Sequence, residues 1–300
     1  MTNQSQGAML AGGTTLTPKS RSGVLYQFIS FCRKQPLGAF SLLVIAVLIF
    51  LAAFGSQVSP YDPKAGAKEL VLTAPSWSHP FGADQAGRDI LSRLIAGASV
   101  SLYVSAGAVV MGTLSGVFIG VVSGYLEGPF DAIVQRLVDA LMSIPLIVIA
   151  IMLISLREPS LNNLVIALSI AIAPRASRVA RGSALSVKHE QYVEAATAIG
   201  ATTPRILWRY IVPNIFAPIL VLISVNMGGV IVAEASLSFL GLGPPTLISW
   251  GGMLSAEGRQ FMQVAPWMAI YPGAAIMVTV LAFNLLGDAL RDVLDPRLRS

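Results

Sequence analysis

LGAFSLLVIAVLIFLAAFGSQV, residues 37–58, carries no charged side chain over 22 positions. A helix needs roughly 20 consecutive apolar residues to cross the hydrocarbon core of a bilayer, so this stretch predicts a transmembrane helix. The composition of the 300-residue chain agrees, because 54% of its residues are hydrophobic, only 12% are charged, and its mean hydropathy is +0.71. The sequence therefore predicts an all-α polytopic membrane protein. A transmembrane β-barrel would require short alternating segments instead of continuous apolar runs.

Further apolar runs bring the expected number of transmembrane helices to about six. The fourth run is short, so its helix is expected to continue through the arginines that follow. The expected later spans cover residues 99–124, 137–156, 164–174, 215–233 and 267–287. These spans divide the chain into a tail with an interfacial helix (1–36), the first span (37–58), an extracytoplasmic loop (59–98), a transmembrane core (99–290) that contains a cytoplasmic segment (182–213), and a C-terminal tail (291–300).

The distribution of Lys and Arg predicts the orientation of the chain. With the N-terminus in the cytoplasm, fourteen of the twenty Lys and Arg residues lie on the inner side and six on the outer side. Loops rich in Lys and Arg remain in the cytoplasm, so both termini are predicted to lie inside. Arg175, Arg178 and Arg181 are expected to contact lipid phosphates.

Small and polar residues within the spans offer further hypotheses. Glycines every fourth residue make a smooth stripe on the second span, which predicts close packing either within the chain or with a second membrane subunit (Gly112, Gly116, Gly120, Gly124). Polar residues within spans are costly and could line a translocation path, or could pair across helices (Asp139, Asn226, Glu234, Asn284). An aromatic cluster near the outer end of the last span is interpreted as an interfacial belt (Trp250, Trp267, Tyr271).

Several enzymatic motifs are missing from the sequence. It contains no GxxxxGK phosphate loop, no HExxH and no GxSxG. The two histidines, His79 and His189, are predicted on opposite sides of the membrane, His79 in a loop and His189 in solvent. With one cysteine and two histidines, no disulfide or zinc site is expected. We expect neither catalysis nor a cofactor in this chain.

Residues 189–214 form a polar segment between the fourth and fifth spans. Apolar positions from His189 to Ile199 follow helical spacing, and Gly200 is suited to a left-handed C-terminal cap. Thr203 before a proline predicts the N-cap of a second helix, which Pro213 ends, and Asn214 is expected to cap the fifth span. The first helix carries two acids and almost no basic residues, so docking on a protein partner is favoured over lying on anionic headgroups.

The segment EAATAIG followed by IVPN resembles the EAA loop of ABC importer permeases, with Tyr210 and Val212 at positions that are often Ile and Leu. Three other segments resemble the dipeptide/oligopeptide subfamily, and more narrowly its C-type subunit: HPFGADQAGRDILSRLIAGASVSL, AEASLSFLGLG and LAFNLLGDALRDVLDPRLR. Together the similar segments cover residues 78–299. The resemblance implies an inner-membrane permease in which the EAA helices couple to a partner ATPase (Glu194, Ala195, Ala196, Gly200, Pro213).

The same resemblance implies the partners: a homologous second permease, two cytoplasmic ATPase subunits that bind ATP and Mg²⁺, and an extracytoplasmic solute-binding protein. Transport would proceed by alternating access driven by ATP on the partner subunits. Relatives carry dipeptides, oligopeptides, glutathione, nickel complexes or sugar-derived solutes, so the solute stays open. The alternatives are a gradient-driven secondary transporter or channel, which would show inverted repeats, and a membrane scaffold with no solute flux.

Overall fold

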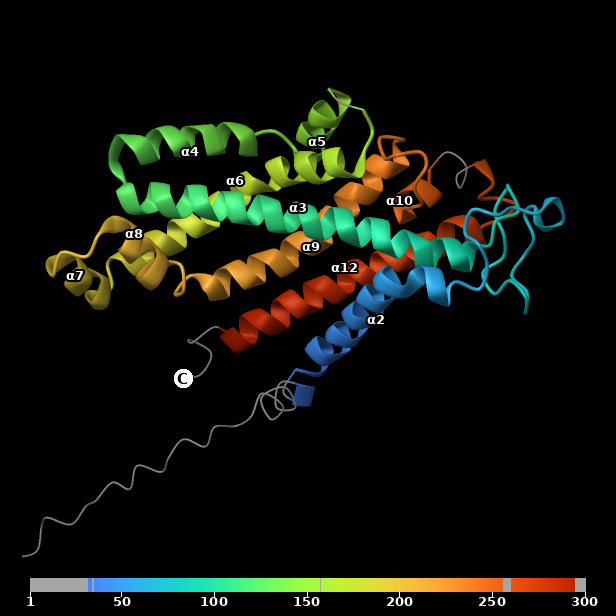
Figure 1. The fold of residues 1–300 in the computed structure, drawn as a ribbon, viewed down its shortest axis with the longest axis horizontal. Helices are drawn as coiled ribbons and strands as arrows, with labels where there is room; N and C mark the ends of the chain where they lie inside the picture. Colours follow the sequence, from blue (N-terminus) through green and yellow to red (C-terminus); the bar gives the residue numbers. More distant parts are fainter. Residues whose placement is uncertain (1–31, 34, 157, 256–259, 295–300) are drawn as a thin grey trace, which may run out of the picture.

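The computed structural model describes residues 32–33, 35–156, 158–255 and 260–294, and these form an elongated bundle of long helices (Figure 1). The expected interfacial helix before residue 32 and the tail beyond residue 294 lie outside the described residues. Five helices are long and apolar enough to cross a membrane. They are α2 (Pro36–Val58), α3 (Ile90–Leu126), α6 (Leu161–Lys188), α9 (Phe216–Phe239) and α12 (Trp267–Leu294).

The predicted spans correspond to these helices, most of which extend further than predicted. Helix α3 begins nine residues before the expected start at residue 99, and α6 continues through Arg175, Arg178 and Arg181 as expected. Helix α9 runs six residues past residue 233 and α12 seven past residue 287. The extensions carry polar or charged residues that hydropathy alone assigns to loops, yet their backbone groups remain paired inside the helices.

The predicted third span is not one straight helix. Residues 128–155 form α4 (Gly128–Met142) and α5 (Leu146–Ser155), which meet at an angle of 88° and together give a sixth, broken span if the bent pair is counted as one. Pro145 stands at the break, where it has no N–H to donate and disfavours helical backbone at Ile144. The prediction of a continuous helix over 137–156 was therefore wrong. Figure 1 shows α4 lying along α3 and α6, with α5 turned away from it.

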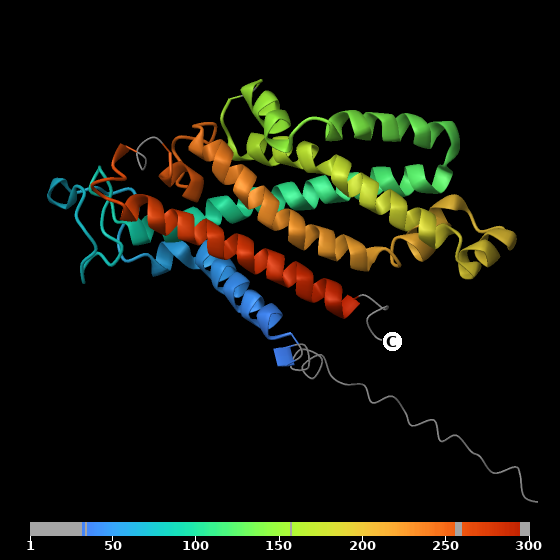
Figure 2. The same cartoon turned by 180° about the vertical axis from the view of Figure 1, so that it is seen from behind.

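Two ends of the bundle carry the shorter elements, and Figure 2 shows them on opposite sides of the molecule. At the end called here the α7 end lie α7 (Gln191–Ala198), α8 (Thr203–Ile206) and the π-helical turn η2 (Leu207–Ile211). At the end called the loop end lie the loop of residues 59–89, with its short 3₁₀ turn η1 (Lys68–Leu70), and α10 (Trp250–Met253).

The glycine stripe of α3 packs against α6 of the same chain. An added Cβ at Gly112 would lie 2.6 Å from the carbonyl oxygen of Ser169, and one at Gly120 would lie 2.1 Å from that of Ser177. Such distances leave no room for a side chain, so the two backbones approach as closely as small residues permit. Of the two alternatives that the sequence left open, packing within the chain is the one that the structure shows.

Ion pairs join α4 to α6 and correct the expectation of lipid-phosphate contacts for Arg178 and Arg181, while for Arg175 it stays a prediction. Asp131, Gln135 and Asp139 recur every four residues on α4 and so lie on one face. Arg181 pairs with Asp131 through both nitrogens of its fork, and Arg178 pairs with Asp139. Carboxylates within reach on the neighbouring helix neutralise the arginines more directly than headgroups would.

Breaking the Asp131–Arg181 pair is expected to destabilise the bundle. The Asp131 side chain is 9% exposed, so Asp131→Ala should cost more than the ~1 kcal/mol of an exposed pair and approach the ~3–5 kcal/mol of a buried one. Asp139→Ala is the matched control, because the Asp139 side chain is 57% exposed and its loss should cost under about 1 kcal/mol. Heating followed by size-exclusion chromatography measures both. The charge swap Asp131→Arg with Arg181→Asp should restore part of the loss, and equal stability of the two alanine variants would contradict the argument.

Candidate partner-binding site

The α7–α8 pair has the two-helix form that the sequence predicts. Helix α7 ends before Gly200, whose φ of +83° places it in the left-handed region that favours glycine. The Gly200 N–H donates to the Thr197 carbonyl and the Ala201 N–H to the Ala196 carbonyl, a Schellman-type cap. Gly200 therefore sets the turn between the two helices, and the predicted cap is confirmed.

Two details of the second helix differ from expectation. The N-cap is Thr202 and not Thr203, because Thr203 already has helical backbone, with Pro204 following in the first turn. Asn214 does not cap α9; its side-chain amide donates to the Tyr210 carbonyl and so closes the end of η2. In the π-helical turn the Tyr210 carbonyl does not accept from the backbone N–H four residues later, which donates to Ile211 instead. The side-chain amide of Asn214 takes the place of that donor.

A small apolar cluster fastens the helix pair to the bundle. Val193 of α7 and Ile206 of α8 are each 1% exposed and pack in a cluster with Ile211, Ile215 and Val121 of α3. Ala196 is also buried, at 4% exposure, so its methyl group faces the chain itself. The alanine that the sequence suggested for contact with a partner thus lets α7 lie close to its own bundle, while Ala195 remains exposed.

Exposed apolar and charged side chains lie together along α7, the turn after it, α8 and η2. Ile199 is 85% exposed at the turn and Trp208 is 67% exposed, and Tyr192 adds a third exposed apolar side chain. Charged residues that flank them are also exposed (Glu190, Glu194, Arg205, Arg209). In both views of the bundle the pair projects beyond the ends of α3, α6 and α9 (Figures 1 and 2). Such a set of exposed anchors with a polar rim is typical of a protein-docking surface.

A further ion pair ties the base of this surface to the rest of the bundle. The Lys188 ammonium at the end of α6 donates to Glu127 Oε1 at 2.8 Å and to the Tyr125 carbonyl at 2.8 Å. Its hydrogen bond and charge hold the pKa of the Glu127 carboxyl below the usual value. The turn between α3 and α4 is thereby joined to the residue that precedes α7.

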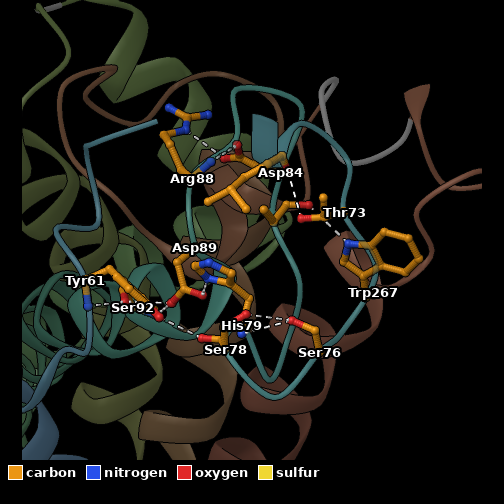
Figure 3. Close-up of polar contacts among 12 residues, drawn as sticks. Tyr61, Thr73, Ser76, Ser78, His79, Asp84, Arg88, Asp89, Ser92 and Trp267 are labelled. Atoms are coloured by element: carbon orange, nitrogen blue, oxygen red, sulfur yellow. Dashed lines mark hydrogen bonds and ion pairs between the residues drawn. The ribbon is translucent and has the colours of Figure 1, made fainter. Parts of the chain in front are cut away.

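The loop end is built around His79, which the sequence predicts in a loop, and Asp89 at the start of α3. His79 Nδ1 lies 3.0 Å from Asp89 Oδ1, and Asp89 Oδ2 accepts from the Ser92 N–H at 2.8 Å, capping α3 (Figure 3). The Tyr61 ring packs on the imidazole with ring centres 4.6 Å apart. Both His79 and Asp89 are buried, so the loop is fixed onto the start of α3.

Of the aromatic residues expected in an interfacial belt, Trp267 and Tyr271 contact this loop and Trp250 contacts α3. Trp250 is 2% exposed and donates to the Leu94 carbonyl, and Trp267 donates to the Ala83 carbonyl at 3.1 Å (Figure 3). The Tyr271 ring stacks on Phe81 with centres 4.1 Å apart. The belt prediction was wrong for Trp250, because a buried indole that needs an acceptor finds one on the neighbouring helix.

The four polar residues proposed for a translocation path occupy different surroundings. Asp139 pairs with Arg178, while Asn284 lies against Gly228 of α9. Asn226 and Glu234 are buried in α9, and each has one side-chain atom without a hydrogen-bond partner among the described residues. Glu234 lines a cavity at the loop end. Their part in a path stays a prediction.

Five long apolar helices and a bent pair among the described residues define a multi-pass membrane protein, with a short helix pair at one end. The chain belongs to the family of binding-protein-dependent transport system inner membrane components, whose model matches residues 116–300. It is an inner-membrane permease of an ABC importer. The matched region includes the whole of α7 and α8.

Curated relatives cover nearly the whole chain. The glutathione transport system permease protein GsiD of Pectobacterium atrosepticum is 38% identical over 295 residues, 98% of each chain. GsiD of Escherichia coli O6:K15:H31 is 39% identical over 278 residues, 92% of this chain and 91% of the relative. A protein of Brucella suis biovar 1, provisionally named as a peptide transport system permease, is 39% identical over 259 residues, 86% of this chain and 87% of the relative.

Proposed function

We propose that this permease imports peptides or a related small solute by alternating access, driven by ATP on partner ATPase subunits. The names of its relatives support a peptide-like solute, since they are assigned to peptide and glutathione transport. The family supports the need for partners, because its members serve binding-protein-dependent systems.

The observation that carries the proposal is the exposed surface of α7 and α8. Ile199 and Trp208 are too exposed to stabilise the chain itself, and their burial in a partner groove would recover the apolar area that they now present. We place the α7 end in the cytoplasm, in keeping with the distribution of Lys and Arg along the sequence. In this orientation Glu194 and Ala195 face the ATPase. Gly200 sets the angle between α7 and α8, and Ala196 and Pro213 shape the base of this helix pair.

The proposed complex contains a homologous second permease, two ATPase subunits and an extracytoplasmic solute-binding protein. ATP and Mg²⁺ belong to the ATPase subunits, and this chain holds no cofactor of its own. Closure of the ATPases would displace α7 and α8, and the apolar cluster around Val193 together with the Lys188–Glu127 pair would pass that displacement to α6 and α3.

Uptake by reconstituted complex tests this function. The complex is purified through a tag on this chain and placed in liposomes with labelled alanyl-alanine and a panel of peptides, including glutathione, each presented with the binding protein. We expect uptake that requires ATP and Mg²⁺ and that persists when ion gradients are dissipated. Uptake by the chain without ATPase subunits, abolished by dissipating a gradient, would identify a secondary transporter or channel. No flux of any tested solute would favour a scaffold.

A further inference from the structure

The turn between α3 and α4 contains a strained residue. Glu127 has a φ of 54° and a ψ of −161°, at the edge of a backbone region that is essentially restricted to glycine. Gly128 follows with a φ of 64°, and nothing lies within 4 Å of a Cβ added there. A strained backbone of this kind persists only where the surrounding contacts hold it. The contacts of Glu127 therefore have to account for its conformation.

Lys188, the last residue of α6, supplies those contacts. Glu127 stands at the N-cap position of α4, where a carboxylate usually accepts from backbone N–H groups of the first turn. Among the described residues it makes no such capping bond, and its Oε1 accepts from the Lys188 ammonium at 2.8 Å instead. The same ammonium donates to the Tyr125 carbonyl at 2.8 Å and lies 5.2 Å from the centre of the Tyr125 ring. One lysine thus holds both the end of α3 and the side chain of the strained residue.

The backbone of the turn joins α4 to α3 more weakly than it ends α3. The Glu127 N–H donates to the Ser123 carbonyl at 2.9 Å, so the last turn of α3 is well formed. The Glu127 carbonyl accepts from the Asp131 N–H at 3.5 Å, which is long for a bond of this type. Pro129 has no N–H to add to the first turn of α4. The direction of α4 relative to α3 therefore depends on side-chain contacts.

The position of Lys188 links these contacts to α7. Two residues, His189 and Glu190, separate it from the start of α7 at Gln191. The Glu190 N–H donates to the Val187 carbonyl at 3.1 Å, and the Glu190 carbonyl accepts from the Val193 N–H at 2.8 Å. Hydrogen bonds on both sides leave this connection little freedom, so a displacement of α7 moves the backbone of Lys188 with it.

We propose that the α3–α4 turn is a hinge and that Lys188 is a positioning residue, which holds the hinge in its strained position until α7 is displaced. The inference rests on the proposed function, because docking of ATPase subunits on α7 and α8 is what would displace α7. Once Lys188 is withdrawn, Glu127 leaves the region of positive φ and the first turn of α4 changes direction. Helix α4 continues into α5, so the movement reaches the broken span that lies beside α3 and α6 (Figure 1).

The exposure of the ion pair suits a contact that breaks and forms again in each cycle. The Lys188 side chain is 28% exposed and that of Glu127 is 44% exposed. Ion pairs that water can reach contribute little net stability, because solvent compensates each charge when the pair separates. A fully buried pair would leave an uncompensated charge and resist opening. The hinge can therefore open without a large loss of stability.

Hydrogen exchange at the turn tests this role. The backbone amides within residues 127–131 are followed by mass spectrometry in the purified complex, without nucleotide and after trapping with ATP and vanadate. Wild type should exchange roughly 3- to 10-fold faster when trapped, as expected for losing one partly exposed ion pair and one hydrogen bond. Lys188→Met should exchange fast in both states, while Lys188→Arg, which keeps donors for both oxygens, should restore the dependence on nucleotide. Lys68→Met removes an exposed lysine at the loop end and should leave this dependence unchanged.

A double-mutant comparison shows whether Lys188 acts through Glu127. Glu127→Gln weakens the same contact, so the double variant should exchange no faster than Lys188→Met alone. Lys188→Met should also hydrolyse ATP while transporting fewer solute molecules per ATP, which a merely structural loss would not produce.

Three results would overturn the hinge: additive effects of the two substitutions, a nucleotide dependence that survives in Lys188→Met, or equal exchange in the two nucleotide states of wild type. The comparison of the two wild-type states needs no variant, so it decides the matter even where Lys188→Met does not fold. Each of these results leaves ATP-driven uptake by wild type untouched, and the absence of that uptake would instead overturn the proposed function.

Discussion

Replacing Ile199 by aspartate is expected to lower ATP-driven uptake by about 10- to 100-fold while the amount of folded, inserted protein stays the same. Ile199 is 85% exposed at the turn between α7 and α8, so the change removes no internal packing. At the centre of a docking surface, however, an apolar anchor exchanged for a charge leaves that charge buried against the partner, and such positions cost about 2 kcal/mol or more. The variant should also bind the ATPase subunits more weakly.

Matched variants separate this effect from the mere addition of a charge. Val71→Asp makes a similar change at an exposed apolar residue of the loop end, where 44% of Val71 is exposed, and it should leave ATPase binding intact. Ile199→Leu keeps the apolar surface and should behave as wild type. Copurification of the ATPase subunits, uptake and size-exclusion profiles are measured for all three variants. Normal uptake by Ile199→Asp would place the docking surface elsewhere.

Replacing Gly120 by alanine is expected to separate α3 from α6 and to reduce the yield of folded protein sharply. The added Cβ would lie 2.1 Å from the Ser177 carbonyl oxygen and 3.0 Å from the Arg181 nitrogen, both backbone atoms that cannot rotate away. Overpacking of this kind costs about 1–3 kcal/mol or more. The displaced segment of α6 also carries Arg181, so the pair with Asp131 would be strained by the same change.

The control for this substitution lies on another span. Gly229 of α9 has nothing within 4 Å of an added Cβ, so Gly229→Ala introduces the same methyl group without a clash. It should be neutral or slightly stabilising, since alanine favours a helix over glycine by about 0.5–1 kcal/mol. Thermal stability in detergent is compared for the two variants. A Gly120→Ala protein as stable as Gly229→Ala would show that the helices can move apart at little cost.

Much of the fold follows from local features of the sequence. Continuous apolar runs predict the spans, because a chain in lipid must pair its backbone groups within each segment. The turn at Gly200 is predicted for an equally local reason, since a left-handed residue after a helical run favours glycine. The glycine stripe of α3 indicated a close helix contact, although its period alone could not distinguish α6 from a second subunit.

The candidate site was predictable in outline but not in orientation. Helical spacing alone placed Ala195 and Ala196 side by side, yet the structure buries Ala196 and exposes Ala195. Which face of α7 turns inward depends on Ile206 and Ile211, which come later in the chain and complete the cluster around Val193. That Ile199 and Trp208 are exposed is seen only in the packed structure.

By itself, the sequence determined the properties that depend on neighbours along the chain: the spans, the polar segment between the fourth and fifth of them, and the Gly200 turn. Only the tertiary structure decided which distant groups meet. It paired Arg181 with Asp131, 50 residues away, placed the Trp250 indole on the Leu94 carbonyl, 156 residues away, and buried Glu234 in the wall of a cavity at the loop end. The physical reason is that the partners of a buried charge or donor are chosen by packing between helices, and helical periodicity carries no information on which helix lies opposite.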